Sequence, residues 1–203
     1  MLVVHYTGMT SGAEALDRLC DPEAKVSAHY LIELDGGVFR LVDEDKRAWH
    51  AGVAWWRGEL DVNGRSVGIE LVNPGHEFGY RAFPHAQMVA LEGLAASILK
   101  RHPIPPRNVV GHSDVAPRRK QDPGERFDWK RLARAGVGLW VDGTPPLDAT
   151  DDEVLAMLSA YGYEVADPTA TLAAFQRHFR PARVDGVADA ETAGILKALL
   201  DAA

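Results

Sequence analysis

The sequence predicts an α/β or α+β domain through about residue 142, followed by a small all-α bundle. In the first part, short apolar strands alternate with helices, and the longest segment with helical spacing, 85–100, is suited to lie on a sheet. The segment 142–146, Asp-Gly-Thr-Pro-Pro, is typical of a linker. A chain of 203 residues is long enough for one domain of about 150 residues and a smaller second one.

The elements of the first part follow from apolar periodicity and from the residues that end each segment. We expect strands at 2–6, 29–34, 38–42, 66–72 and 108–111, and helices at 10–19, 85–100 and 128–136. Asp35-Gly36-Gly37 is a strong hairpin signal between the second and third strands. Asp128 is a suitable N-cap for the last helix, and Gly136 is a suitable stop.

The second part is predicted to contain three short amphipathic helices, which on their own would bury only a marginal core. Thr150 and Glu153 form a capping box that opens the first helix, and Gly162 marks its end. The second helix begins near Thr169 and the third near Asp189. We therefore expect a first domain at 1–142, a linker at 143–149 and a helical domain at 150–203.

The composition argues against several classes of protein. A net charge of −7 disfavours a nucleic-acid partner, because a phosphate backbone requires a basic face. No segment approaches the roughly 20 apolar residues of a membrane span. No signal peptide precedes the first strand, so we expect a cytoplasmic protein, or one whose export signal was removed before the numbering begins. Cys20, the one cysteine, cannot form an internal disulfide and is expected to be a small buried or half-buried thiol.

The segment 111–124 is the strongest candidate for chemistry. It places His112 and Asp122 ten residues apart, with Lys120 two positions before the aspartate, among prolines and glycines that predict a loop. A loop that holds these three residue types is better suited to chemistry than to packing. One further ligand would complete a zinc site with an open fourth position. The candidates for this ligand are three histidines among which periodicity alone does not choose: His5, His29 and His50.

Glu70 is the second notable residue. Alternation along the strand 66–72 places Val67, Ile69 and Leu71 on one face, and Glu70 on the other. A carboxylate at the centre of an apolar strand is costly unless it is paired or near a metal ion. Glu70 is therefore either a solvated residue on an exposed sheet face or a general base that takes a proton from an attacking water.

Five stretches occur in this order along the chain: Val4–Thr7, Ser27–Ile32, Ala48–Gly52, Ser66–Glu70 and Gly111–Gly124. Together they resemble the zinc-dependent N-acetylmuramoyl-L-alanine amidases of the peptidoglycan-recognition-protein superfamily. The resemblance covers roughly residues 1–140 and implies an α/β fold with a mixed central sheet flanked by helices.

The resemblance also implies roles for individual residues. It implies that His5, His112 and Asp122 bind one Zn²⁺, that Glu70 is the catalytic carboxylate, and that Lys120 stabilises the oxyanion. Further residues are expected to line the site or to contact substrate, the arginines by pairing with a carboxylate of the stem peptide: His29, His50, Trp49, Arg118 and Arg119.

The implied reaction is hydrolysis of the amide that joins the lactyl group of N-acetylmuramic acid to L-alanine. The expected partner is a muropeptide or peptidoglycan fragment, and the protein is expected to be a monomer. Two branches of the family are open: cytoplasmic recycling of 1,6-anhydro-muropeptides, which the absent signal favours, and an envelope branch, which often has the same helical tail. A non-catalytic recognition module is the alternative, but such members typically lack a metal ligand. A peptidase that cuts within the stem peptide is disfavoured because no His-Glu-x-x-His helix is present.

The helical tail has a resemblance of its own, to the three-helix peptidoglycan-binding domain. It rests on Tyr161–Tyr163, Phe175-Gln176, Val184–Val187 and Glu191-Thr192. The turn that begins at Asp185-Gly186 lacks the second glycine usual in that domain. The tail is therefore expected either to bind glycan or only to pack on the first domain.

Overall fold

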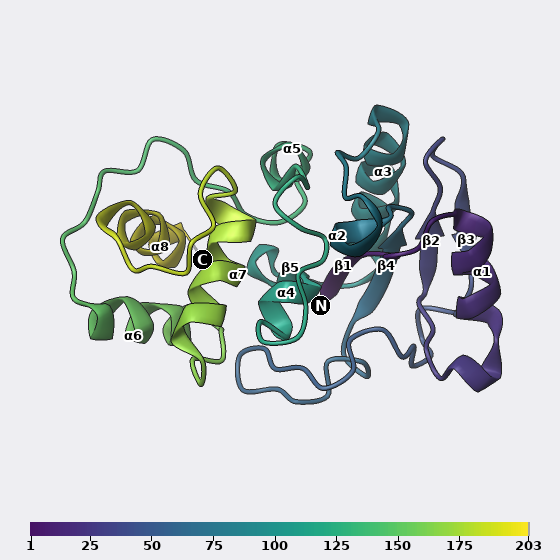
Figure 1. The fold of residues 1–203 in the computed structure, drawn as a ribbon, viewed down its shortest axis with the longest axis horizontal. Coiled ribbons are helices and arrows are strands. Elements are labelled where there is room, and N and C mark those ends of the chain that lie inside the picture. Colours follow the sequence, from purple (N-terminus) through teal and green to yellow (C-terminus); the bar gives the residue numbers. More distant parts are fainter. Residues whose placement is uncertain (203) are drawn as a thin grey trace.

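The computed structural model describes residues 1–202, so Ala203, the last residue of the expected helical domain, lies outside the described residues. In Figure 1 a central sheet stands among helices, and a group of three helices, α6, α7 and α8, lies beside it. The strands are β1 (Leu2–Tyr6), β2 (Tyr30–Ile32), β3 (Val38–Arg40), β4 (Val67–Leu71) and β5 (Val109–Gly111). The α-helices are α1 (Gly12–Cys20), α2 (Gly75–Phe78), α3 (His85–Arg101), α4 (His112–Val115), α5 (Trp129–Arg134), α6 (Asp151–Tyr161), α7 (Pro168–Phe179) and α8 (Ala190–Ala202).

The five strands form one mixed sheet in the order β3-β2-β4-β1-β5. β1 pairs in parallel with β4 and β5, β2 pairs in parallel with β4, and β3 is an antiparallel edge strand. The predicted turn connects β2 to β3, and its Gly36 has a φ of +91°, which favours glycine. A mixed central sheet flanked by helices confirms the fold class implied by the sequence.

The two faces of the sheet are covered by different elements. Side chains alternate along a strand, so Leu2 and Val4 point to one face of β1, where they join a core that includes residues of α3 and α5. Val3 and His5 point to the opposite face. The β4 residues predicted to share a face belong to the core under α3: Val67, Ile69 and Leu71.

The opposite face is covered at its two ends. On the β2 side, Ala15 of α1 packs against Leu31. On the β5 side, Val3 and Val110 belong to a core that includes residues of α6, α7 and α8. Between these contacts, His5 and Glu70 lie opposite one another on the adjacent strands β1 and β4. The fold therefore places two polar residues between the two apolar clusters on this face.

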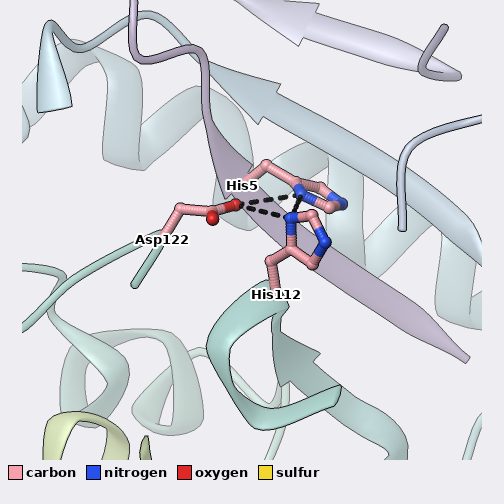
Figure 2. Close-up of side chains that lie close together, drawn as sticks. All are labelled: His5, His112 and Asp122. Carbon is pink, nitrogen blue, oxygen red and sulfur yellow. Dashed lines mark hydrogen bonds and ion pairs between the residues drawn. The ribbon is translucent and has the colours of Figure 1, made fainter. Parts of the chain in front are cut away.

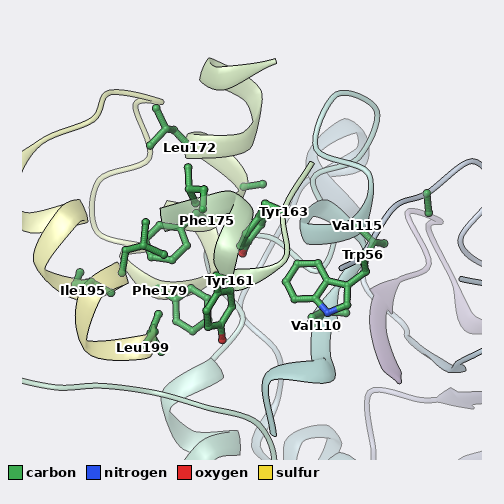
Figure 3. Close-up of a cluster of buried hydrophobic side chains, with 14 of the residues drawn as sticks. Trp56, Val110, Val115, Tyr161, Tyr163, Leu172, Phe175, Phe179, Ile195 and Leu199 are labelled. Atoms are coloured by element: carbon green, nitrogen blue, oxygen red, sulfur yellow. The ribbon is translucent and has the colours of Figure 1, made fainter. Parts of the chain in front are cut away.

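The helices α6–α8 form one continuous core with the sheet domain (Figure 3). Trp56, from the first part of the chain, contacts Tyr163 edge to face with ring centroids 5.0 Å apart, and Phe175 of α7 lies behind Tyr163. The segment expected to be a linker is also held in place, because the Leu147 N–H donates to the carbonyl of Ala190 in α8. The helical part is therefore docked on the sheet domain through buried side chains.

Two expectations differ from the structure. Cys20 is exposed, because it is the last residue of α1 and does not belong to the core on which that helix packs. Part of the expected loop is helical, because the segment 112–115 has neither proline nor glycine and forms the single turn α4. No helix among residues 1–202 is both long and apolar enough to cross a membrane.

Phe175 is completely buried in the shared core. We expect Phe175→Ala to lower the free energy of unfolding by about 3–5 kcal/mol, because it leaves a cavity that neighbours cannot fill. Urea titration followed by circular dichroism and tryptophan fluorescence measures this, and both signals should report one transition. Phe78→Ala, at a side chain that is 52% exposed, is the control. Two separate transitions would contradict a continuous core.

Candidate active site

The three side chains predicted as metal ligands lie together (Figure 2). His5 is near the C-terminal end of β1, His112 begins α4 directly after β5, and Asp122 is in the following loop. Because β1 and β5 are parallel neighbours, their C-terminal ends bring the two histidines to one edge of the sheet. Nδ1 of His5 is 3.0 Å from Nδ1 of His112, and each lies 3.1 Å from Oδ2 of Asp122. All three side chains are buried.

A chain of hydrogen bonds determines which nitrogen of His5 carries the proton. The Ser66 hydroxyl donates to the Val62 carbonyl at 2.6 Å, so its oxygen accepts from Nε2 of His50, 3.2 Å away. Nδ1 of neutral His50 then lacks a proton and accepts from Nε2 of His5 at 3.0 Å. Nδ1 of neutral His5 is left with a lone pair directed at the centre of the site.

Burial favours the neutral form of both histidines in this chain. Burial, together with the nearby His112, lowers the pKa of His5 to about 4. Burial also lowers the pKa of His50 well below its ordinary value of 6.5, and the neighbouring His5 adds to the shift. Gly68 allows the ring of His50 to approach β4, since a Cβ at this position would lie 2.5 Å from the ring. The proton positions described above therefore hold at pH 7.

His112 is also oriented by a hydrogen bond from the ring nitrogen that points away from the site. Its Nε2 donates to the carbonyl of Ala51 at 3.0 Å, so Nδ1 of neutral His112 also presents a lone pair. Oδ2 of Asp122 lies 3.1 Å from the Nδ1 nitrogens of His5 and His112 and adds a carboxylate oxygen to the set. Three electron-pair donors therefore face one another at the centre.

This donor set fits a metal ion. Three acceptors about 3 Å apart repel one another unless a cation lies between them. Imidazole nitrogen and carboxylate oxygen are both Zn²⁺ ligands, and bonds of about 2.0–2.1 Å would place tetrahedral ligands about 3.3 Å apart. The separations of 3.0 and 3.1 Å between the three ligand atoms are close to this value.

Glu70 lies beside His5 on the neighbouring strand, because the register of β1 and β4 pairs these two residues. Its Oε2 is buried and has no hydrogen-bond partner, so it is not the solvated glutamate of an exposed sheet face. Burial raises the pKa of Glu70 well above its ordinary value of 4.5, and the charge of Asp122 raises it further, while Lys120 opposes the shift. A carboxylate in this environment is suited to accept a proton near neutral pH.

The site opens into a cavity of about 610 Å³. Its lining includes Glu70, Lys120, His50 and Trp49, all of which the sequence singled out. The Trp49 side chain is 56% exposed, while its backbone N–H donates to the hydroxyl of Ser27 at 2.9 Å. The anchored backbone holds a large apolar ring at the rim of the cavity, where a ligand can reach it.

The two predicted arginines have different surroundings. Arg119 lines the cavity, and its Nη2 donates to the carbonyls of Ala51 and Val53. Arg118 points toward the helical part, where its Nη2 lies 3.3 Å from a carboxylate oxygen of Glu164. Of these two consecutive residues, only Arg119 is placed to meet a ligand in the cavity.

His29 does not line the cavity, although the sequence suggested it. It is completely buried, and its Nδ1 accepts from the Gly68 N–H at 2.9 Å, so it supports the sheet. Sequence reasoning did not identify Ser66 and Asn63. Ser66 orients His50 as described, and Oδ1 of Asn63 accepts from the backbone N–H of His50 at 3.1 Å. Neither residue belongs to a spacing pattern that indicates such a role.

A further wall of the cavity was also not predicted. The Tyr6 hydroxyl is 2.9 Å from Nδ1 of His76 in α2, and Nε2 of His76 is 3.1 Å from the Glu125 carboxylate. Nε2–H therefore donates to the carboxylate, and Nδ1 accepts from the hydroxyl. The ring of His76 stacks on Tyr80 with centroids 4.3 Å apart. Tyr6 and His76 line the cavity, while Glu125 and Tyr80 contact the ring of His76. Tyr6 and His76 are far apart in the sequence, so only the fold shows that they form one wall.

The comparison with known families agrees with this geometry. Residues 1–125 match the family described as N-acetylmuramoyl-L-alanine amidase. AmiD of Escherichia coli K12, named an N-acetylmuramoyl-L-alanine amidase, is 39% identical over 99% of this chain and 82% of its own length. This chain belongs to the N-acetylmuramoyl-L-alanine amidase family.

Solved structures extend the similarity to the helical part of this amidase. A structure of E. coli AmiD superposes with a TM-score of 0.90 at 38% identity, covering 100% of this chain and 88% of AmiD. AmpDh3 of Pseudomonas aeruginosa superposes with a TM-score of 0.85 at 37% identity, covering 98% of this chain and 89% of AmpDh3. AmpD of E. coli K12 is 42% identical over 65% of this chain and 79% of its own length.

The raised pKa of Glu70 predicts a pH-dependent cost to the stability of the metal-free amidase. A folded-state pKa above the unfolded value means that this group stabilises the fold at low pH, and that the stability is lost as pH rises through the folded pKa. We expect Glu70→Gln to have a higher Tm than the wild type at pH 8, with this gain vanishing at pH 4.5 and below. Thermal unfolding in chelator across this range measures it. Glu77→Gln, at an exposed carboxylate on the same cavity, should show no such gain. A Glu70→Gln effect independent of pH would contradict the argument.

The hydrogen bond from His5 to His50 predicts a role for His50 in metal binding. A ligating histidine depends on the partner of its second nitrogen, and loss of that partner typically lowers metal affinity by about 10–100-fold. We expect a loss of this size for His50→Ala, measured by competition with a zinc chelator. His85→Ala, at an exposed histidine of α3, is the matched control. Unchanged affinity in the His50 variant would show that His5 needs no orienting partner.

Proposed function

We propose that this amidase uses one Zn²⁺ to hydrolyse the amide between N-acetylmuramic acid, in its 1,6-anhydro form, and L-alanine of peptidoglycan fragments. The observation that carries the proposal is the convergence of lone pairs from His5, His112 and Asp122 beside the buried carboxylate of Glu70. Metal ligands and a base on one side of a cavity form a hydrolytic centre. A module that only binds peptidoglycan has no use for a buried, unpaired carboxylate, which costs stability.

Three relatives support the choice of substrate. The AmiD structure is a complex with the substrate anhydro-N-acetylmuramic acid-L-Ala-D-gamma-Glu-L-Lys. The AmpDh3 structure is a complex with anhydromuramic pentapeptide. AmpD is named a 1,6-anhydro-N-acetylmuramyl-L-alanine amidase. By similarity, we assign to this chain a fragment that carries the anhydro sugar and a stem peptide, consistent with cell-wall recycling.

The residues of the site have different roles in the reaction. His5, His112 and Asp122 would hold the Zn²⁺, which supplies a Lewis acid that polarises the scissile carbonyl and lowers the pKa of water. Glu70 takes a proton from the attacking water and returns it to the nitrogen of the departing alanine. Lys120 stabilises the negative charge that develops on the carbonyl oxygen.

Substrate contacts are assigned to the predicted residues that line the cavity. Trp49 and His50 border the sugar or the peptide, and Arg119 pairs with a carboxylate of the stem peptide. His29 and Arg118 are left out of this assignment, because neither lines the cavity.

The organisation of the chain is part of the proposal. We assign catalysis to 1–142, a linker to 143–149 and a helical domain to 150–203, in a protein that acts as a monomer. The shared core supports docking of the helical domain on the catalytic one. The proposed compartment is the cytoplasm, where the recycling branch of the family acts. Recovery of the protein in the envelope fraction of cells would contradict this assignment.

Hydrolysis of a purified 1,6-anhydro-muropeptide, followed by mass spectrometry, tests the activity. We expect release of the free stem peptide and the anhydro sugar, abolished by chelation and restored by Zn²⁺. Glu70→Gln should lower kcat by about 10²–10⁴-fold, as expected for loss of a general base. Lys120→Ala should lower kcat by about 10²–10³-fold. Lys100→Ala, at an exposed lysine of α3, is the control.

Each of these experiments has an outcome that would contradict part of the proposal. Turnover that survives Glu70→Gln would remove the base from the mechanism. Turnover that survives zinc removal would remove the metal. Faster release of peptide from intact sacculus than from the anhydro fragment would assign the enzyme to the polymer instead of to recycled fragments.

A further inference from the structure

Asp114 is a buried carboxylate that the proposed mechanism does not use, although it lies two positions after the proposed ligand His112. It is 1% exposed, and both of its oxygens are engaged. Oδ2 accepts from the backbone N–H of Gly111 at 2.7 Å and from Nδ1 of His178 at 2.7 Å. Oδ1 accepts from the Tyr163 hydroxyl at 2.7 Å. Two of its three partners therefore come from the helical part of the chain.

Both of these partners are held by aromatic packing. The ring of His178, in α7, stacks on Trp129 of α5 with centroids 3.8 Å apart and an interplanar angle of 14°. The ring of Tyr163 lies against Trp56 at 5.0 Å and against Phe175 at 6.0 Å. Because these contacts restrict both rings, the hydroxyl and Nδ1 reach Asp114 from fixed positions.

The structure connects Asp114 to the orientation of His112 through the turn that carries both. α4 has only four residues, His112–Val115, and so short a helix is not stable by itself. The carboxylate of Asp114 holds the N–H of Gly111, the residue immediately before His112. An Asp114 deprived of a partner would be a buried carboxylate with an unmet hydrogen bond, which would favour rearrangement of the turn.

We propose that Tyr163 and His178 of the helical domain are positioning residues for metal binding, acting through Asp114 on the turn that carries His112. In this amidase the helical domain is then part of the catalytic unit, whether or not it also binds glycan. The inference rests on the metal centre of the proposed function. Residues of α7, and of the segment before α7, then contribute to metal binding as well as to the stability of the fold.

The matched pair Tyr163→Phe and Tyr161→Phe tests this inference. Both tyrosines are buried in the same core, and each variant removes one hydroxyl and keeps the ring, but only the hydroxyl of Tyr163 reaches Asp114. Metal-free protein is titrated with Zn²⁺ against a chelator. We expect Tyr163→Phe to raise the Kd for Zn²⁺ on the order of 10-fold, because Asp114, which holds the turn that carries His112, loses one of its partners, and Tyr161→Phe to leave it unchanged. The visible spectrum of the Co²⁺-substituted protein should shift in the first variant only.

His178 supplies a second, independent comparison. His178→Ala removes the donor to Asp114, whereas His178→Asn retains an N–H at nearly the position of Nδ1. We expect weaker Zn²⁺ binding for the alanine variant, and recovery of most of the wild-type affinity for the asparagine variant. A role confined to stability would lower Tm in both variants without this recovery, because asparagine replaces none of the ring that stacks on Trp129.

The outcomes separate this inference from the proposed function. Equal Kd values for Tyr163→Phe, Tyr161→Phe and the wild type would overturn the inference and leave the zinc amidase proposal intact. Failure of the wild type itself to bind Zn²⁺ would overturn the proposed metal centre, and this inference with it.

Discussion

Two N–H groups that point away from the centre of the site determine what the centre can hold. Nε2 of His5 donates to His50, and Nε2 of His112 donates to the carbonyl of Ala51. Both Nδ1 atoms are therefore acceptors, and they face the carboxylate of Asp122. Three acceptors in mutual contact are stable only around a cation. The preference for a metal ion thus depends on the residues behind the ligands as much as on the ligands themselves.

The sheet makes this arrangement possible and also makes it costly. Because β1 has parallel neighbours on both sides, it brings His5 next to Glu70 on β4 and next to the strand that leads into His112. The same burial that keeps His5 neutral leaves Oε2 of Glu70 without a partner. Such sites reduce stability, and the loss has to be offset elsewhere in the fold. The aromatic core shared with the helices α6–α8 is the largest buried apolar cluster available for this, and it lies on the same face of the sheet.

The sequence predicts the local parts of this structure well. The hairpin at 35–37, the capping box of α6 and the alternation of β4 depend on neighbouring residues, and each is present as expected. What the spacing of residues could not decide is non-local. Periodicity left three histidines as candidates for the third ligand, and only the pairing of β1 with β5 brings His5 to His112. Likewise, alternation placed Glu70 on the correct face, but whether that face is solvated depends on elements that cover it from elsewhere in the chain.

The segment 111–124 shows why a motif alone cannot assign roles to its residues. His112, Lys120 and Asp122 face the cavity, whereas Asp114 and Arg118 face the helical part of the chain. The loop is therefore in contact with substrate space on one side and with another part of the protein on the other. Both surroundings constrain which amino acids the loop can carry, one through chemistry and the other through packing and buried hydrogen bonds. A resemblance between sequences does not tell the residues that chemistry constrains from those that packing constrains. Their separation requires the fold, because, of the consecutive residues Arg118 and Arg119, only the second lines the cavity, while the first pairs with Glu164.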